Sequence, residues 1–174
     1  MKLLTFAASN SRQSINKQLV TYAASLVEGA EVEVLDLNDF EMPIYSGDRE
    51  AESGIPPEAH AFFDKIGSAD AIVIGFAEHN GSYSAAYKNL FDWTSRIDMK
   101  VYQNKPMVLL ATSPGPGGAT SVLNAAFGSA SYFAADVKAH LSIPSFFDNF
   151  DMETKVLKDA SLNDQLHSAM SQLG

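Results

Sequence analysis

The chain has 174 residues, a length that suits one domain, and its 46% of apolar residues is typical of a folded globular protein. Twelve Lys and Arg residues are outnumbered by 21 Asp and Glu residues, and the resulting net charge of −9 argues against nucleic acid and anionic membranes as partners. Cysteine is absent, which excludes disulfides, thiolate nucleophiles and cysteine-ligated metals. No apolar run suits a signal peptide or a membrane span, so we expect a soluble, cytoplasmic protein.

The hydrophobic pattern predicts strands and helices in alternation. Strands are expected at 2–8, 31–37, 69–76, 107–112 and 137–143. Helices are expected at 15–27, 58–67, 84–96, 119–134 and 161–173, and a long loop with several Pro and Gly residues at 39–57. The near-continuous apolar run at 69–76 is typical of a strand that is buried on both faces.

This alternation predicts one α/β domain over residues 1–174, a flavodoxin-like three-layer α/β/α sandwich. Its five-stranded parallel sheet is expected to have the order 2-1-3-4-5. Ligands of such sheets bind at the carboxyl ends of the strands, at the switch point between strands 1 and 3. The loops at 9–16, 77–82 and 113–118, which follow strands 1, 3 and 4, should therefore meet in one crevice.

The charge is distributed unevenly along the chain. Residues 1–27 contain three bases, Lys2, Arg12 and Lys17, and no acid, so this segment carries +3. The remaining nine bases and 21 acids carry −12. Chance in a short window is one explanation, and an anion that binds close to the segment is the other.

The loop at 9–16 has the chemistry of a phosphate-binding site. It combines hydroxyl and amide side chains, a guanidinium and backbone N–H groups at the start of a helix, supplied by Ser9, Ser11, Arg12, Ser14 and Asn16. The alternative is a simple N-cap cluster around Ser14. A Walker loop is excluded because no G-K-[ST] occurs, and a dinucleotide fingerprint is excluded because no glycine precedes residue 29.

The two later loops add polar groups and glycines. Glu78, His79 and Asn80 follow a buried strand, although Asn80-Gly81 alone is also a common turn pair. In the third loop, Gly117 and Gly118 either let a flat ligand approach the backbone closely or allow the loop to adopt unusual backbone dihedral angles.

Three motifs occur together in a recognisable order and spacing. They are Ser9-x-x-Arg12-x-Ser14-x-Asn16, then Glu78-His79-Asn80-Gly81-Ser82-Tyr83 with Lys88-Asn89-x-x-Asp92-Trp93, and Lys105-Pro106 leading to Ser113-Pro114-Gly115-x-Gly117-Gly118. Together they resemble the NAD(P)H-dependent FMN reductase family, which includes flavin, quinone, azo-dye and chromate reductases of flavodoxin-like fold. Two departures are Ala77 and His79, where the family usually has Pro and Tyr, and the arginine, which the family usually has at the position of Ser11.

The resemblance implies FMN and NAD(P)H as cofactors. It implies that the FMN phosphate is held by Ser9, Ser11, Arg12, Ser14 and Asn16. It implies that the isoalloxazine is lined by Glu78, His79, Asn80 and Gly81, with Ser113 and Gly117 on its other edge, and Ile15 and Gly115 complete the cofactor-binding set. Since the flavin would carry the chemistry, no catalytic residue and no metal ligand is assigned.

The sequence therefore predicts an FMN-dependent NAD(P)H oxidoreductase that passes hydride through FMN to a small-molecule electron acceptor such as a flavin or quinone. A flavodoxin-type electron carrier without NAD(P)H activity is the alternative, although the glycine of its phosphate loop is missing from 9–16. A non-catalytic binding module is a third possibility. The aromatic helix at 84–96 serves core packing or an interface, and in the resembling family it lies at a dimer interface, so a homodimer or homotetramer is expected.

Overall fold

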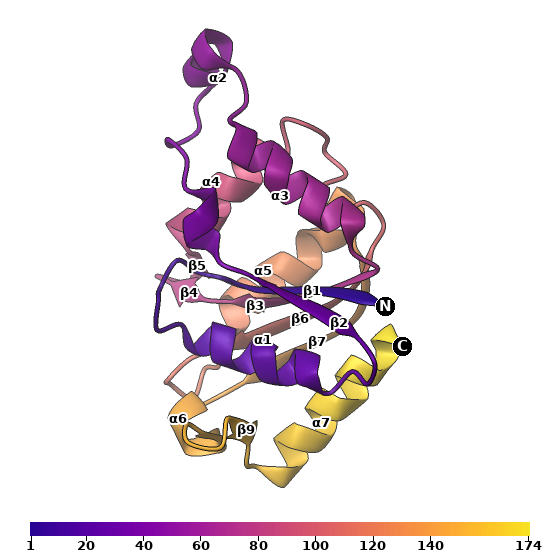
Figure 1. Ribbon diagram of the computed structural model, residues 1–174. Coiled ribbons are helices and arrows are strands. Elements are labelled where there is room, and N and C mark those ends of the chain that lie inside the picture. Colours follow the sequence, from indigo (N-terminus) through magenta and orange to yellow (C-terminus); the bar gives the residue numbers. More distant parts are fainter.

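The computed structural model describes residues 1–174 and shows a parallel sheet between two layers of helices (Figure 1). The sheet has the strand order β2-β1-β3-β6-β7, and every neighbouring pair is parallel. Its strands are β1 (Lys2–Ala8), β2 (Glu31–Leu35), β3 (Ala71–Phe76), β6 (Pro106–Thr112) and β7 (Asp136–Ile143). The expected flavodoxin-like order is thereby confirmed.

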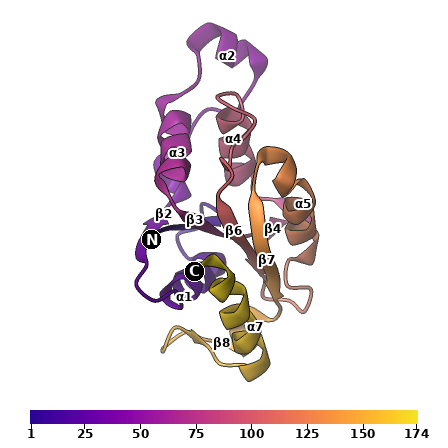
Figure 2. The ribbon, with the colours of Figure 1, turned by 90° about the vertical axis from the view of Figure 1, so that its right-hand side faces the viewer.

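Helices cover both faces of the sheet (Figure 2). One face carries α1 (Ile15–Ser25) and α7 (Ala160–Met170), and the other carries α3 (Pro57–Ser68), α4 (Ala85–Thr94) and α5 (Thr120–Ala130). Short 3₁₀ turns are η1 (Leu37–Phe40), η2 (Ser131–Phe133) and η3 (Ser171–Leu173). None of the helices combines the length and the apolarity that crossing a lipid bilayer requires.

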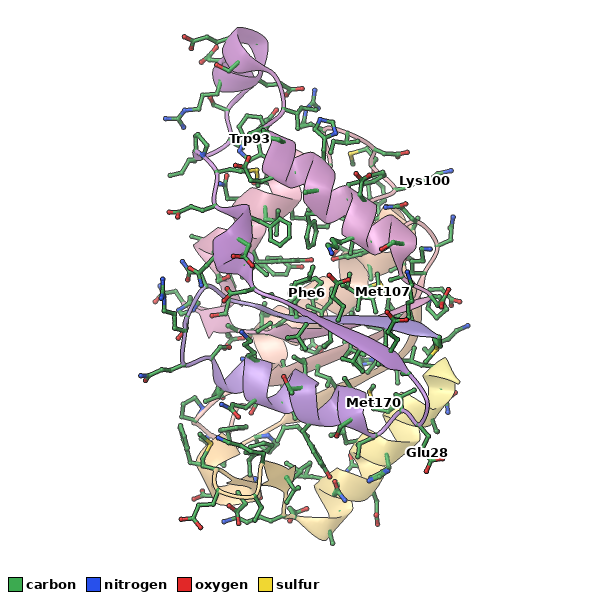
Figure 3. The ribbon with its side chains drawn as sticks, in the orientation of Figure 1. Phe6, Glu28, Trp93, Lys100, Met107 and Met170 are labelled. Carbon is green, nitrogen blue, oxygen red and sulfur yellow. The ribbon has the colours of Figure 1, made fainter.

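Two clusters of buried apolar side chains hold the layers together, one on each face of the sheet. Successive side chains of a strand point to opposite faces, so Leu4 and Phe6 of β1 join the cluster under α3, α4 and α5, whereas Leu3 joins the other. Figure 3 shows Phe6 and Met107 on the α3 side of the sheet and Met170 on the α1 side. All six residues of β3 are buried, as its apolar run predicts.

Small elements occupy the connections. They are α2 (Gly47–Ser53), α6 (Phe146–Asn149), the hairpin β4 (Glu78–His79) to β5 (Ser82–Tyr83), and the hairpin β8 (Phe150–Asp151) to β9 (Val156–Leu157). The long loop predicted at 39–57 contains one short helix, α2, which was not predicted. Ser46 caps this helix by accepting a hydrogen bond from the N–H of Arg49, and Gly54 ends it. None of its residues is buried, so its sequence lacks the helical spacing of apolar residues from which a helix is predicted.

The segment that contains α2 projects from the body of the molecule and is attached to α4 (Figure 1). The Asn89 amide donates to the carbonyls of Met42 (3.2 Å) and Pro43 (3.1 Å), and Trp93 Nε1 donates to the same Pro43 carbonyl (2.7 Å). Arg96 Nε pairs with Glu50 Oε2 at 2.8 Å. Asn89 and Trp93 of α4, together with Arg96 just after it, therefore fix a segment that buries little apolar surface of its own.

Helix α1 packs directly on β3 because position 75 has no side chain. A Cβ at Gly75 would lie 2.7 Å from Val20 Cγ1 and 3.1 Å from the backbone oxygen of Asn16. The first distance is shorter than real Cβ contacts and the second is tighter than most, so Val20 or its surroundings would have to shift. Gly75 therefore sets how closely the start of α1 approaches the sheet.

The turn of the β8–β9 hairpin is organised by one carboxylate. The N–H groups of Thr154 (3.1 Å) and Glu153 (2.8 Å) donate to Asp151 Oδ1, and the N–H of Lys155 donates to the Asp151 carbonyl (2.8 Å). The N–H groups of Thr154 and Glu153 hold the pKa of Asp151 below its ordinary value. The turn is therefore a fixed structure rather than a loose connection.

Replacing Gly75 with Ala should destabilise the protein by about 2 kcal/mol, because the added methyl overpacks the contact between α1 and β3. Urea unfolding measures this. Gly128→Ala is the matched control, since a Cβ at this helical position meets nothing within 4 Å and Ala should be neutral or stabilising there. Equal stabilities of the two variants would contradict the assigned role of Gly75.

The lowered pKa of Asp151 gives a pH dependence with a definite sign. The stability that its carboxylate contributes is present above the pKa of an unfolded Asp, about 3.9, and is lost as the pH falls through the lower folded-state value. Acidification from neutral pH should therefore narrow the difference in free energy of unfolding between the wild type and Asp151→Asn. A difference in free energy of unfolding that stays constant as the pH falls would refute the assignment.

Candidate functional site

One hollow of about 260 Å³ opens at the carboxyl ends of β1, β3 and β6. The structure brings together there the three loops that the sequence places at this edge. The lining residues are Ser9, Ser11, Gln13, Ser14, Ile15, Asn16, Ala77, Glu78, His79, Thr112, Ser113, Pro114 and Phe147. Eight of the sequence-predicted site residues are among them, and the others lie in or beside the same loops.

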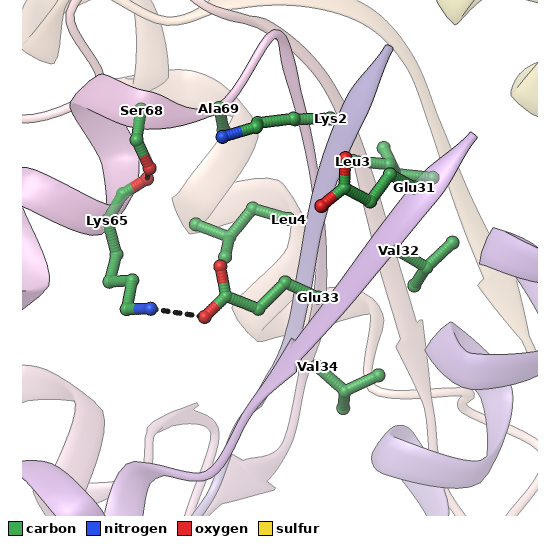
Figure 4. A pocket seen from close by; sticks show the side chains of 10 residues that line it. All are labelled: Lys2, Leu3, Leu4, Glu31, Val32, Glu33, Val34, Lys65, Ser68 and Ala69. Carbon is green, nitrogen blue, oxygen red and sulfur yellow. Dashed lines mark hydrogen bonds and ion pairs between the residues drawn. The ribbon is translucent and has the colours of Figure 1, made fainter.

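A larger hollow of about 410 Å³ lies at the opposite edge of the sheet, between β2 and α3 (Figure 4). It is lined by the amino-terminal halves of β1 and β2 and the end of α3. Its charged side chains are partly neutralised by an ion pair between Lys65 and Glu33. Ligands of parallel sheets bind at the carboxyl ends of the strands, so position favours the smaller hollow as the functional site.

The serine hydroxyls of the first loop are partly used by the loop itself. Ser9 Oγ accepts from the N–H of Ser11 (3.1 Å), Ser11 Oγ accepts from the N–H of Gln13 (3.2 Å), and Ser14 Oγ accepts from the N–H of Lys17 (3.2 Å). A hydroxyl that accepts a hydrogen bond still has its own proton to donate. The three serines are therefore fixed in place and keep three O–H donors for a ligand.

Backbone donors lie beside these hydroxyls. We define the cradle as the O–H groups of Ser9, Ser11 and Ser14 together with four backbone N–H groups that are free. The N–H groups of Arg12, Ser14, Ile15 and Asn16 donate to no other group of the chain. They lie at the amino terminus of α1, where the helix dipole favours negative charge. This donor set matches the acceptor oxygens of a phosphate.

Asn16 positions the cradle. Its side chain is 2% exposed and exchanges two hydrogen bonds with the backbone of Thr112. Asn16 Nδ2 donates to the Thr112 carbonyl (3.2 Å), and the Thr112 N–H donates to Asn16 Oδ1 (3.1 Å). The pair ties the loop after β1 to the end of β6, across the intervening β3. The amide oxygen of Asn16 is thus occupied, and its backbone N–H is the donor left for an anion.

Arg12 lies beside the hollow. It lines a neighbouring groove on the solvent-facing side of α1, which shares Ser14 with the hollow. The exposed Arg12 side chain makes no ion pair within the chain.

The hairpin β4–β5 joins the hollow to α5. Glu78 Oε1 accepts a hydrogen bond from the N–H of Val122 (2.8 Å) in the first turn of α5, a favourable place for a carboxylate. Asn80 (φ 53°) and Gly81 (φ 76°) form the hairpin turn, whose left-handed backbone accounts for both residue types. Neither residue lines the hollow, whereas Glu78 and His79 do.

The glycine loop contributes one wall through Ser113. Gly118 has φ 59°, and a Cβ there would lie 2.2 Å from Ser142 Oγ and 3.1 Å from the Pro144 backbone, so this glycine is required by packing within the chain. A Cβ at Gly115 or Gly117 would meet nothing within 4 Å, and neither residue lines the hollow.

Sequence reasoning missed Phe147, which belongs to α6 and closes the hollow on the β7 side. Its side chain is 55% exposed, although the backbone beside it is held to the glycine loop. The N–H of Ser145 donates to the Gly115 carbonyl (2.9 Å), and the N–H of Phe146 donates to the Ser113 carbonyl (3.0 Å). The aromatic cluster that follows the fifth strand, with Phe146, Phe147 and Phe150, is the signal that could have identified it. Gln13, Ala77, Thr112 and Pro114 were also missed, and they neighbour predicted residues in the chain.

Residues 1–148 match the family model of NADPH-dependent FMN reductases. The chain is 32% identical over 125 residues to an NADPH:quinone oxidoreductase of Arabidopsis thaliana, covering 70% of this chain and 62% of the relative. It is 34% identical over 120 residues to a 2-hydroxy-1,4-benzoquinone reductase of a Burkholderia species, covering 68% and 63%. The chain thus spans somewhat less than two thirds of the length of these curated relatives.

Solved structures share the fold. The flavoenzyme NAD(P)H:(acceptor) oxidoreductase FerB of Paracoccus denitrificans superimposes with a TM-score of 0.77 at 22% identity, covering 99% of this chain and 94% of that chain. An FMN-dependent NADH-azoreductase of Bacillus anthracis, crystallised with FMN, gives 0.68 at 13% identity and covers 99% of both chains.

Replacing Asn16 with Ala should lower the free energy of unfolding by about 3 kcal/mol, because the N–H and C=O of the buried Thr112 lose their side-chain partner. Chemical denaturation measures the change. Asn124→Ala removes an exposed amide from α5 that makes no hydrogen bond, and should be close to neutral. If the two variants unfolded at the same denaturant concentration, the hydrogen bonds between Asn16 and Thr112 would not contribute to the stability of the protein.

Proposed function

Because the chain belongs to the NADPH-dependent FMN reductase family, we propose that it binds FMN and oxidises NAD(P)H, with a small molecule such as a flavin or quinone as electron acceptor. The observation that carries the proposal is the cradle at the start of α1. Three fixed hydroxyls and four free backbone N–H groups converge there, and no acid lies in that loop. A phosphate monoester is the ligand that this donor set fits.

The phosphate of FMN would be held by the cradle, with Ser14 at the junction of hollow and groove. Asn16 keeps the cradle beside the end of β6 through its bonds to Thr112, so contacts within the chain support the binding geometry. Glu78 is the acid that lines the hollow, and its carboxylate is paired with the amino terminus of α5. The charge that most opposes an anionic ligand is therefore offset locally.

When bound, FMN supplies the hydride-accepting ring system, so the chain needs neither a nucleophile nor a metal of its own. The walls formed by His79, Ser113 and Phe147 orient what enters the hollow. Phe147 offers an exposed aromatic surface, which suits contact with a flat ring. The cytoplasmic location and the homodimeric or homotetrameric assembly expected from the sequence stay predictions within this proposal.

The cradle predicts how Ser14→Ala affects flavin binding. This variant should weaken FMN about tenfold, because one hydroxyl donor to the phosphate is lost. Riboflavin, which has no phosphate, should bind wild type and variant alike, so a general loss of structure is distinguishable from loss of a phosphate contact. Quenching of flavin fluorescence measures both affinities, and Ser168→Ala, an exposed serine on α7, is the control.

The FMN-loaded protein should oxidise NADPH or NADH when a quinone is present, and activity should require FMN. Unchanged FMN affinity in Ser14→Ala would refute the cradle. Tight FMN binding without any oxidation of NAD(P)H would instead favour the flavodoxin-type electron carrier.

A further inference from the structure

A separate pocket with a volume of about 230 Å³ lies between α4 and α5. We call it the aromatic pocket, because half of its ten lining residues are aromatic, namely Tyr83, Tyr87, Phe91, Tyr102 and Phe133. None of its lining residues also lines the flavin hollow or the groove beside α1. The function proposed above therefore makes no use of this pocket.

The walls of the aromatic pocket are rings in contact with one another. The Phe91 ring centroid lies 6.0 Å from that of Tyr87 and 5.8 Å from that of Tyr102. Its distance to the Phe133 ring centroid is 4.7 Å. Aromatic side chains attract further rings at separations of this kind, edge to face or offset. The walls therefore favour an aromatic ligand.

Two tyrosine hydroxyls of the pocket bond to each other. Tyr87 Oη lies 2.5 Å from Tyr102 Oη, and neither hydroxyl makes another hydrogen bond within the chain. The two side chains are 3% and 6% exposed, and this burial raises the pKa of both above the ordinary value, so both stay protonated at neutral pH. Two hydroxyls carry two protons, and the bond between them uses one. The second proton has no acceptor in the chain.

The charged groups of the pocket neutralise each other. Lys88 and Asp92 are the two charged residues that line it, and Lys88 Nζ pairs with Asp92 Oδ1 at 2.7 Å along α4. Burial of an ion is costly unless a partner of opposite charge is available. Since both charges are already paired, the pocket suits a neutral ligand.

The volume and the fixed walls set the size of that ligand. The Tyr102 N–H donates to the Phe133 carbonyl (3.1 Å) and the Asn104 N–H to the Ala134 carbonyl (2.7 Å), so the chain after α4 is held to η2. Met99 also lines the pocket and is 48% exposed, so the pocket reaches solvent beside it. A cavity of about 150 Å³ takes a benzene ring, whereas drug-sized ligands fill roughly 300–1,000 Å³. The aromatic pocket therefore fits one ring with a small substituent, and neither a flavin nor a dinucleotide.

We propose that the aromatic pocket binds a neutral single-ring aromatic compound that carries one acceptor oxygen, such as an aryl ketone. The second hydroxyl proton of the Tyr87–Tyr102 pair donates to that oxygen, and the ring of the ligand packs beside Phe91 and Phe133. The ligand thus supplies the acceptor that the chain itself lacks. Because the pocket is separate from the flavin hollow, the inference does not depend on FMN.

Acetophenone is the probe, because it has one ring, one carbonyl oxygen and no donor. Its binding to the full chain is followed by the NMR signals of methionines labelled with ¹³C at the methyl group. The chain has six methionines, and Met99 is the one that lines the pocket. Acetophenone should shift the Met99 signal in a saturable way and leave the signals of the buried Met107 and Met170 unchanged. The response should be the same with and without FMN, and Met99→Leu assigns the signal.

The role of the hydroxyls is tested by Tyr87→Phe combined with Tyr102→Phe. This double variant should weaken acetophenone about fivefold, because one neutral hydrogen bond is lost. α-Methylstyrene has the same shape with a methylene group in place of the oxygen, and its affinity should not fall. Both partners of a buried hydrogen bond are replaced here by apolar groups of the same shape, so the fold should tolerate the change. Either single variant keeps one hydroxyl proton and should bind acetophenone within about twofold of the wild type.

Ser129→Phe tests the pocket with both tyrosines in place. Ser129 lines the pocket, and its hydroxyl bonds only to carbonyls of its own helix. A phenyl ring at this position should fill the pocket and abolish the response of Met99 to both probes. Ser121→Phe is the matched control, because it adds the same ring at an exposed position of α5 that does not line the pocket.

Three outcomes overturn the proposal. They are a Met99 signal that acetophenone does not shift, an acetophenone affinity that the double variant leaves unchanged, and a response that persists in Ser129→Phe. A Met99 signal that changes with protein concentration but not with the probe overturns it as well, because a second copy of the chain would then cover the pocket. Absence of FMN binding, together with an intact response of Met99, would contradict the proposed function and leave the aromatic pocket as a ligand site.

Discussion

The contact between helix α1 and strand β3 is the constraint on which the site depends. Gly75 leaves no side chain between them, so the backbone of Asn16 lies against the strand. From this position the Asn16 amide reaches across β3 to the Thr112 backbone. The free N–H groups at the start of α1 are thereby held beside the ends of β3 and β6 by contacts within the chain.

The fold was predictable because the strands and the long helices carry apolar residues at a strand or helix period, and all of them except the edge strand β2, where only Leu35 is buried, place most of these residues in the core. The strand β3 is buried throughout, and its apolar run predicts that directly. The elements that were not predicted bury little apolar surface. Helix α2 has no buried residue and depends on a serine cap and on the ion pair of Glu50 with Arg96, which comes from a distant part of the chain.

Within the site, the sequence predicted which loops meet, but not the partner of each side chain. Asn80, Gly81 and Gly118 are polar or flexible residues in the predicted loops, yet the backbone of the chain itself requires them. Glu78 caps α5, an interaction that depends on the packing of two loops separated by more than 40 residues. Arg12 follows the first strand as expected, but the path of the loop decides that it lines the groove.

The positive cradle and groove lie within a negatively charged molecule, and this has a kinetic consequence. Beyond the Debye length of about 8–10 Å, salt screens a phosphate ligand from the charge of the chain. Within that distance, the net charge of −9 opposes the approach of the ligand. The hydrogen-bond donors of the cradle act only once the ligand is in contact with them. The net charge thus slows the association of an anionic ligand, and added salt, which screens this repulsion, would speed it.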